Sequence, residues 1–216
     1  MDFRGAIFDL DGVIVDTAKY HFLAWHRLAG ELGFDFTEED NEELKGVSRM
    51  ASLNILLGKG GLSFPEEKMK MLASRKNEWY VEYISEMDRN EILPGSIALL
   101  RQLNNEGIGT ALATASRNSD IILDRLDIRS LFDAVVDGNQ VTKAKPDPEV
   151  FVKAAEKLGL KAMECLVFED AAAGVEGAVR AGMKCIGIGR PDNLAKADIV
   201  VSGLDKIRIE DLKKLF

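Results

Sequence analysis

Short, mostly apolar runs recur along this chain, and each is followed by polar residues and then by a helical pattern. Because these runs of three to six residues lack polar alternation, they are typical of strands buried on both faces of a parallel sheet. They are residues 6–8, 108–113, 134–136, 165–168, 185–188 and 199–201. Intervening segments such as 94–106, 118–126 and 147–158 have helical length and periodicity. Strands and helices in alternation predict an α/β fold with a doubly wound parallel sheet.

Residues 17 to about 87 break this alternation and contain no convincing strand. Residues 17–32 have the apolar spacing of one helix face, and Gly33 is suited to end that helix. Pro65 suits the first turn of a long helix that runs toward Met87. The two expected capping boxes are Thr37 with Asp40 and Ser63 with Glu66.

An all-helical insertion after the first strand therefore divides the chain. We expect a core domain of residues 1–16 and 88–216 and a helical cap domain of residues 17–87. The two crossings, near Asp16 and at 88–94, would act as hinges.

Charge and hydropathy exclude several classes of protein. The net charge of −8 argues against binding to nucleic acid or to an anionic membrane through bulk charge. No apolar run reaches the roughly 18 residues of a membrane span. Asp9 and Asp11 interrupt the one stretch that resembles a signal peptide, so a cytoplasmic protein is expected. Cys165 and Cys185 begin apolar runs and are expected to be buried, reduced thiols.

Polar side chains stand where the predicted strands end, which is the edge at which open parallel sheets bind ligands. The candidates are Asp9, Asp11, Thr114, Ser116, Glu169 and Asp170. Four carboxylates in one crevice cannot all stay ionised without a cation. Since the donors are hard oxygens with no His or Cys beside them, they suit Mg²⁺ better than zinc. The alternative, that each acid only caps a helix, fits one acid better than it fits four.

The sequence Asp9-Leu10-Asp11-Gly12-Val13 indicates a specific chemistry. Two aspartates at i and i+2 share one side of an extended strand end, and Gly12 lets the backbone approach a small anion. One carboxylate can attack phosphorus and form an aspartyl-phosphate, while the other acts as general acid and base at the leaving oxygen.

These motifs resemble, in order along the chain, those of the haloacid dehalogenase superfamily of phosphotransferases. The resemblance implies that Asp9 is the nucleophile and Asp11 the acid and base, and that Thr114 and Lys145 bind the transferring phosphate. Asp9, Asp11, Glu169 and Asp170 would hold Mg²⁺. The helical insertion resembles the small cap domain of this family, which closes over the site.

Within the superfamily the chain is similar to the β-phosphoglucomutase and sugar-phosphate phosphatase subfamily. The similarity lies in the hinge, in the cap segments 44–49 and 75–77, and in the turn 116–118. Ordinary roles compete with this interpretation, since the cap charges can be solvated and His21 can be a packing residue. The substrate-binding residues implied by the resemblance are Thr17, His21, Lys45, Gly46, Val47, Arg49, Ser52, Lys76, Ala115, Ser116, Arg117 and Asn118.

Two outcomes share all of these residues. Water can attack the phosphorylated aspartate, which gives a phosphatase, or a second sugar hydroxyl can attack it, which gives a mutase. We predict a Mg²⁺-dependent phosphatase of small phosphorylated carbohydrates, with β-phosphoglucomutase as the alternative. A monomer without nucleic-acid or membrane partners is expected. A dehalogenase has no use for Asp11, and a receiver-like phospho-acceptor module needs no lid.

Overall fold

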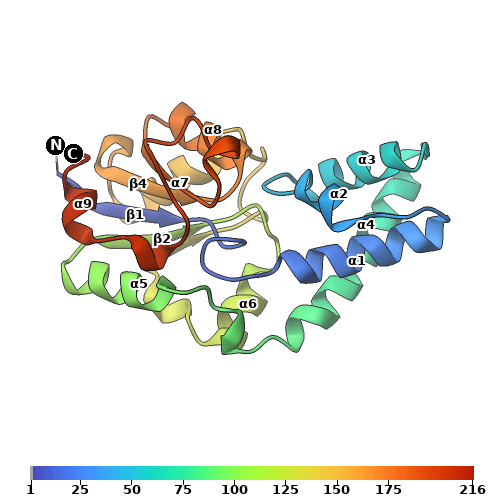
Figure 1. Cartoon of the computed structure of the whole chain (residues 1–216), viewed down its shortest axis with the longest axis horizontal. Helices are drawn as coiled ribbons and strands as arrows, with labels where there is room; N and C mark the ends of the chain where they lie inside the picture. The colour runs from blue at the N-terminus through green and yellow to red at the C-terminus, as the bar shows by residue number, and fades with distance from the viewer. Residues whose placement is uncertain (1) are drawn as a thin grey trace.

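A six-stranded, wholly parallel sheet forms the centre of the computed structural model, which describes residues 2–216 (Figure 1). The strand order is β3-β2-β1-β4-β5-β6, with the first strand of the chain in the middle. The strands are β1 (Gly5–Phe8), β2 (Gly109–Ala113), β3 (Ala134–Val136), β4 (Cys165–Glu169), β5 (Lys184–Ile188) and β6 (Ile199–Val201). All six predicted strands are confirmed, and their ends differ from the prediction by at most one residue.

Helices cover both faces of the sheet, and the reason lies in the alternation of side chains along each strand. Phe8 packs into the core on one face, while its neighbour Ile7 packs into the core on the other. The Phe8 face is covered by α5 (Ser96–Asn105), α6 (Ser119–Leu126) and α9 (Ile209–Lys213). The Ile7 face is covered by α7 (Glu149–Leu158) and α8 (Ala172–Arg180). This three-layer arrangement confirms the predicted doubly wound α/β fold.

Four of the helices that lie between β1 and β2 in sequence form a separate layer at the right of Figure 1. They are α1 (Ala18–Leu32), α2 (Glu38–Glu42), α3 (Arg49–Lys59) and α4 (Glu66–Ser85). The chain crosses into and out of this layer side by side, because Val15 and Ile92 form an antiparallel bridge and Asp16 N–H donates to the Glu91 carbonyl at 2.8 Å. An all-helical insertion after the first strand is thus present, and we propose 17–87 as its domain boundaries.

The helix ends agree with two of the three capping predictions. Gly33 ends α1 with a left-handed φ of 89°, and Thr37 with Asp40 forms a complete capping box at α2. The predicted box of Ser63 with Glu66 is wrong. The α4 helix begins at Glu66 itself, and Pro65, which has no side chain able to cap, occupies the N-cap position.

Both cysteines are buried and free, as expected, Cys165 as the first residue of β4 and Cys185 as the second residue of β5. Among residues 2–216, no helix is long and apolar enough to cross a membrane.

Candidate functional site

Three carboxylates meet at the carboxyl ends of the two central strands. Asp9 directly follows β1, Glu169 ends β4 and Asp170 comes next, and β1 and β4 are hydrogen-bonded neighbours. One carboxylate oxygen from each of the three lies within 4.8 Å of the others. The fourth predicted metal ligand, Asp11, does not contribute its carboxylate to this group.

Lys145 is the cation inside the acidic cluster. Its Nζ lies 2.6 Å from Asp9 Oδ1 and also contacts Glu169 Oε1, and the side chain is almost fully buried. Burial alone would lower the pKa of Lys145, but the charges of Asp9 and Glu169 outweigh it and raise that pKa, so the lysine stays charged.

The single positive charge of Lys145 does not neutralise the three carboxylates of the cluster. Burial, together with the charge of Asp9, raises the pKa of Glu169 to about 7 even though Lys145 opposes the rise. Burial, then the charges of Glu169 and Asp9, raises the pKa of Asp170 well above its ordinary value. A cluster of hard oxygen donors with excess negative charge fits a divalent cation such as Mg²⁺.

Two glycines allow the cluster to pack this closely. Gly12 has a φ of 77°, and a Cβ on it would lie 2.2 Å from Asp170 Oδ2. A Cβ on Gly174, in the first turn of α8, would lie 1.8 Å from Glu169 Oε1. Neither contact leaves room for a larger residue, so the glycines are needed for the carboxylates to approach the backbone.

Asp11 lies beside the cluster and faces the first turn of α1. Its Oδ1 accepts a hydrogen bond from Thr17 Oγ1 and lies 4.0 Å from His21 Nε2. Burial, followed by the charge of Asp9, raises the pKa of Asp11 to about 6. The structure therefore places the predicted acid–base group next to the hinge.

Lys76 of α4 extends this group of side chains into the helical layer. It is only 2% exposed, its Nζ lies 3.0 Å from His21 Nδ1, and its ammonium lies over the rings of Trp25 and Tyr80. Burial and the charge of Arg49 lower the pKa of Lys76 well below its ordinary value. Because Lys76 is buried, the alternative of a solvated helix face does not hold for it.

Tyr80 is a site residue that the sequence analysis missed. It stacks on His21 with ring centroids 4.1 Å apart and is 1% exposed. Its position four residues after Lys76 places it one helical turn away, which is the one signal that the sequence offers.

The predicted cap segment 44–49 touches the core at the metal-site loop. A Cβ on Gly46 would lie 2.6 Å from Ala171 Cβ, and the charge of Lys45 acts on Asp170. Val47 is half-buried in the same segment. Ser52 is buried on α3, and for residues 2–216 no hydrogen bond joins its hydroxyl to the core.

The turn after β2 holds the remaining predicted residues. Thr114 is 1% exposed and its Oγ1 accepts a hydrogen bond from Ser116 N–H at 3.0 Å, while Ala115 is half-buried between them. Asn118 Nδ2 donates to Asn77 Oδ1 of α4 at 2.9 Å, so this turn is bound to the helical layer.

Arg49 and Arg117 approach each other across the boundary between the helical layer and the core. Burial, then the charge of Arg117, lowers the pKa of Arg49. Neither guanidinium has an ion pair or hydrogen bond with any residue in the described range 2–216. Because these two guanidiniums repel each other and have no anionic partner, they are suited to bind an anion together.

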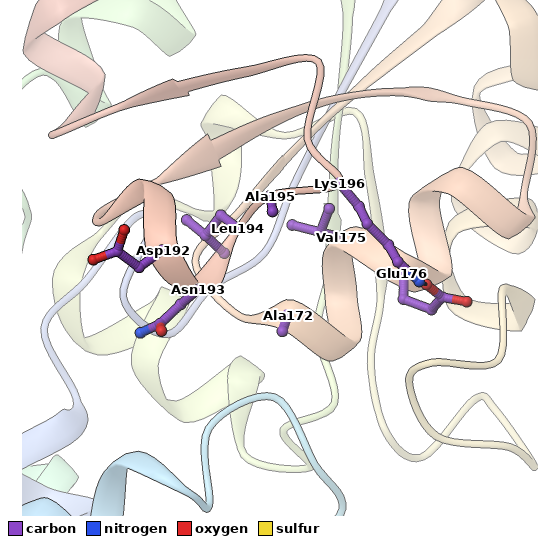
Figure 2. A pocket seen from close by; sticks show the side chains of 8 residues that line it. All are labelled: Ala172, Val175, Glu176, Asp192, Asn193, Leu194, Ala195 and Lys196. Atoms are coloured by element: carbon purple, nitrogen blue, oxygen red, sulfur yellow. Dashed lines mark hydrogen bonds and ion pairs between the residues drawn. The ribbon is translucent and has the colours of Figure 1, made fainter.

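A surface pocket of about 250 Å³ lies outside this site, between α8 and the segment 192–196 (Figure 2). None of the predicted site residues lines it, and two of its three charged residues, Glu176 and Lys196, are already paired with each other. We therefore assign no part of the chemistry to it.

The chain is similar in sequence and in fold to known proteins. The family model of haloacid dehalogenase-like hydrolases matches residues 6–188. A β-phosphoglucomutase of Bacillus subtilis is 42% identical over 209 residues, which are 96% of this chain and 92% of that protein. A phosphorylated carbohydrates phosphatase of Thermotoga maritima is 32% identical over 212 residues, which are 97% and 96% of the two chains.

A solved β-phosphoglucomutase of Clostridium difficile superposes with a TM-score of 0.93 at 39% identity, covering 99% of this chain and 96% of that one. The family match spans most of the chain and these relatives cover it almost completely. The chain therefore belongs to the haloacid dehalogenase-like hydrolase family, among its phosphoglucomutase-like members.

Proposed function

We propose that this chain is a sugar phosphomutase that moves a phosphate between two oxygens of a hexose phosphate through phosphorylated Asp9. The observation that carries the proposal is the pair of unpaired guanidiniums, Arg49 of the helical layer and Arg117 of the core. A phosphatase needs one phosphate site, whereas a mutase must also hold the second phosphate of a bisphosphate intermediate. The 42% identity to a β-phosphoglucomutase supports the same choice.

The first half-reaction would phosphorylate the enzyme. A carboxylate oxygen of Asp9 attacks one phosphorus of a sugar bisphosphate, the bond from that phosphorus to the sugar oxygen breaks, and Asp11 donates a proton to the leaving oxygen, which releases a sugar monophosphate. Lys145, bound to Asp9 at 2.6 Å, offsets the negative charge that develops on the phosphoryl oxygens. Thr114 would hold one of those oxygens at the end of β2.

The second half-reaction would return the phosphate to a different oxygen. A free hydroxyl of a sugar monophosphate gives its proton to Asp11, and that oxygen attacks the phosphorus on Asp9. The bond from phosphorus to Asp9 breaks, which restores the free carboxylate and yields a sugar bisphosphate. The bisphosphate then turns in the closed site so that its other phosphate faces Asp9, and during this turn Arg49 and Arg117 would hold the phosphate that is not being transferred.

We propose Mg²⁺ as the cofactor, held by Asp9, Glu169 and Asp170. When bound, it would neutralise the carboxylates and draw negative charge from the phosphoryl group. The carboxylates lie within 4.8 Å of one another, and the raised pKa values of Glu169 and Asp170 indicate uncompensated negative charge, both of which support this assignment.

Hydrolysis, which the sequence analysis predicts in first place, is the second candidate. Asp11 keeps 29% of its side chain exposed, so water can reach the acid–base group. The 32% identity to a phosphorylated carbohydrates phosphatase favours this candidate as well.

The deciding measurement is the product formed from β-glucose 1-phosphate with a trace of glucose 1,6-bisphosphate and Mg²⁺. The mutase is supported if glucose 6-phosphate forms far faster than inorganic phosphate. Release of inorganic phosphate as the main product, from this and other sugar phosphates, would overturn the mutase and leave the phosphatase.

Two arginine variants test whether the second phosphate site determines the product. Arg49→Ala should raise the share of inorganic phosphate and the KM, because it removes a contact to the retained phosphate. Arg75→Ala is the matched control, since this neighbouring cap arginine pairs with Glu31 at 2.9 Å on the outer surface. An unchanged product ratio in Arg49→Ala would contradict the proposed second phosphate site.

A further inference from the structure

The segment Asp137-Gly138-Asn139, which follows β3, lies directly against the turn 114–118. Gly138 N–H donates to the Ser116 carbonyl at 2.9 Å, and Asn139 Nδ2 donates to the Arg117 carbonyl at 3.1 Å. The contact arises because β3 is the neighbour of β2 in the sheet, so that the two strands end side by side. Two successive carbonyls of the turn are thus held from one side.

Because the peptide unit is planar, the hydrogen bond to the Ser116 carbonyl also fixes the direction of the Arg117 N–H. The Ser116 carbonyl and the Arg117 N–H belong to one trans peptide unit, in which they point in opposite directions. Because Gly138 holds the carbonyl, the Arg117 N–H must point away from the supporting segment.

The hydrogen bonds of the turn leave alternate N–H groups free. Ser116 N–H donates to Thr114 Oγ1, and Asn118 N–H donates to Ser116 Oγ at 3.2 Å. Among residues 2–216, neither Ala115 N–H nor Arg117 N–H has a partner. Free N–H groups beside an unpaired guanidinium at the start of α6 suit an anion.

Asp137 holds the supporting segment in shape. This carboxylate is 4% exposed and accepts hydrogen bonds from Asn139 N–H and Asn139 Nδ2, both at 2.9 Å, and from Ser119 Oγ at 3.3 Å. One amide hydrogen of Asn139 therefore goes to Asp137, which directs the other toward the Arg117 carbonyl.

Gly138 has no space for a side chain. A Cβ at this position would lie 2.4 Å from the Ala115 carbonyl oxygen and 3.0 Å from Arg117 Cγ. The main chain of the segment therefore packs directly against the turn and against the stem of Arg117, and it limits where both can go.

We propose that Asp137, Gly138 and Asn139 are positioning residues that aim the Arg117 N–H and guanidinium at the second phosphate of a sugar bisphosphate. The inference rests on the proposed phosphomutase function, because only that function requires a second phosphate site. The three residues touch the turn and not the substrate, so their effect should depend on whether the substrate carries that second phosphate.

The test compares two phosphate donors, glucose 1,6-bisphosphate and acetyl phosphate, which has one phosphate and no distal group. For Asn139→Ala, the KM for glucose 1,6-bisphosphate should rise about tenfold, while phosphorylation of Asp9 by acetyl phosphate should stay within about twofold.

Asn104→Ala is the matched control for stability. Asn104 Nδ2 donates to the Leu131 carbonyl at 3.1 Å and Asn104 Oδ1 accepts from Thr110 at 3.1 Å, at the opposite end of the same two strands. This variant should lower the melting temperature as Asn139→Ala does, but it should leave the ratio of the two donors unchanged.

Equal losses with both donors, or no loss with either, would overturn the positioning role. A wild-type enzyme that accepts acetyl phosphate but not the bisphosphate would instead overturn the proposed function, and the inference with it. The two failures are distinguishable because one appears in the variants and the other in the wild-type enzyme.

Discussion

At the scale of single residues, the site separates two aspartates that stand two positions apart. Asp9 lies in the acidic cluster against Lys145, whereas Asp11 faces Thr17 and His21 at the hinge. The separation suits a nucleophile and an acid–base group, because the first must meet phosphorus and the second must meet the sugar oxygen.

Replacing Asp9 by Asn should abolish turnover, because an amide cannot serve as the nucleophile. We expect no labelled phosphoenzyme from a ³²P-labelled donor, while the circular dichroism spectrum stays that of the wild type. Asp16→Asn is the control, since the exposed Asp16 carboxylate accepts a hydrogen bond from Ala18 N–H at 3.3 Å and lies outside the acidic cluster. Residual activity in the Asp9 variant, once deamidation is excluded by mass spectrometry, would rule out the covalent mechanism.

At the scale of elements, the loop that carries Lys145 is fastened to the start of α7 by Glu149. Glu149 Oε2 accepts hydrogen bonds from the N–H groups of Thr142 and Lys143 at 2.9 and 2.8 Å, and Oε1 pairs with Lys153 at 2.6 Å. Lys153, followed by the Lys143 N–H, lowers the pKa of Glu149 to about 2.

This lowered pKa predicts a pH-dependent contribution to stability. A depressed carboxylate pKa stabilises the fold above the unfolded-state value of roughly 4.5, and that stabilisation is lost as the pH falls toward about 2. The difference in unfolding free energy between wild type and Glu149→Gln should therefore shrink as the pH is lowered from about 5.

Urea denaturation at a series of pH values measures this difference. Glu156→Gln is the control on the same helix, since this exposed glutamate makes no side-chain hydrogen bond or ion pair within residues 2–216. A difference that stays constant, or grows, as the solution is acidified would contradict the role of Glu149.

Strands that are buried on both faces could be predicted from the sequence. Contacts between different helices and strands could not be predicted from it. The strands could be predicted because a strand buried on both faces leaves a continuous apolar run, and the acid that ends it marks the site. The support that Asn139 gives to Arg117 depends on β3 lying next to β2, and local sequence carries no signal for that order. Tyr80 was missed for the same reason, since an aromatic residue on a helix resembles any core residue.

At the scale of the whole molecule, the helical layer and the core are in contact around the site. Gly46 packs against Ala171, and Asn77 accepts a hydrogen bond from Asn118. Lys76 is almost fully buried by this arrangement. A sugar phosphate that must reach these residues cannot enter unless the cap moves away from the core.

We therefore expect ligand-free enzyme in solution to be more expanded than the liganded enzyme, with hinges near Thr17 and 88–94. Small-angle scattering of the unreactive Asp9→Asn variant should show a smaller radius of gyration with Mg²⁺ and glucose 1,6-bisphosphate than without them. The control is glucose alone, which has no phosphate to hold the cap. Scattering curves that superimpose with and without the bisphosphate would contradict cap closure.

The pairing of the central strands has a consequence for the order of folding. Gly5 of β1 is in register with Gly109 of β2, so the pair closes a loop of about one hundred residues, at an entropic cost on the order of 4 kcal/mol. Helices α1 to α4 lie inside this loop, and α1 packs against α4 within it. Early packing of these helices would bring Val15 and Ile92 together and would shorten the loop that pairing of β1 with β2 must close. In pulse-labelled hydrogen exchange during refolding, amides of α1 and α4 should gain protection before those of β1, although β1 stands first in the chain.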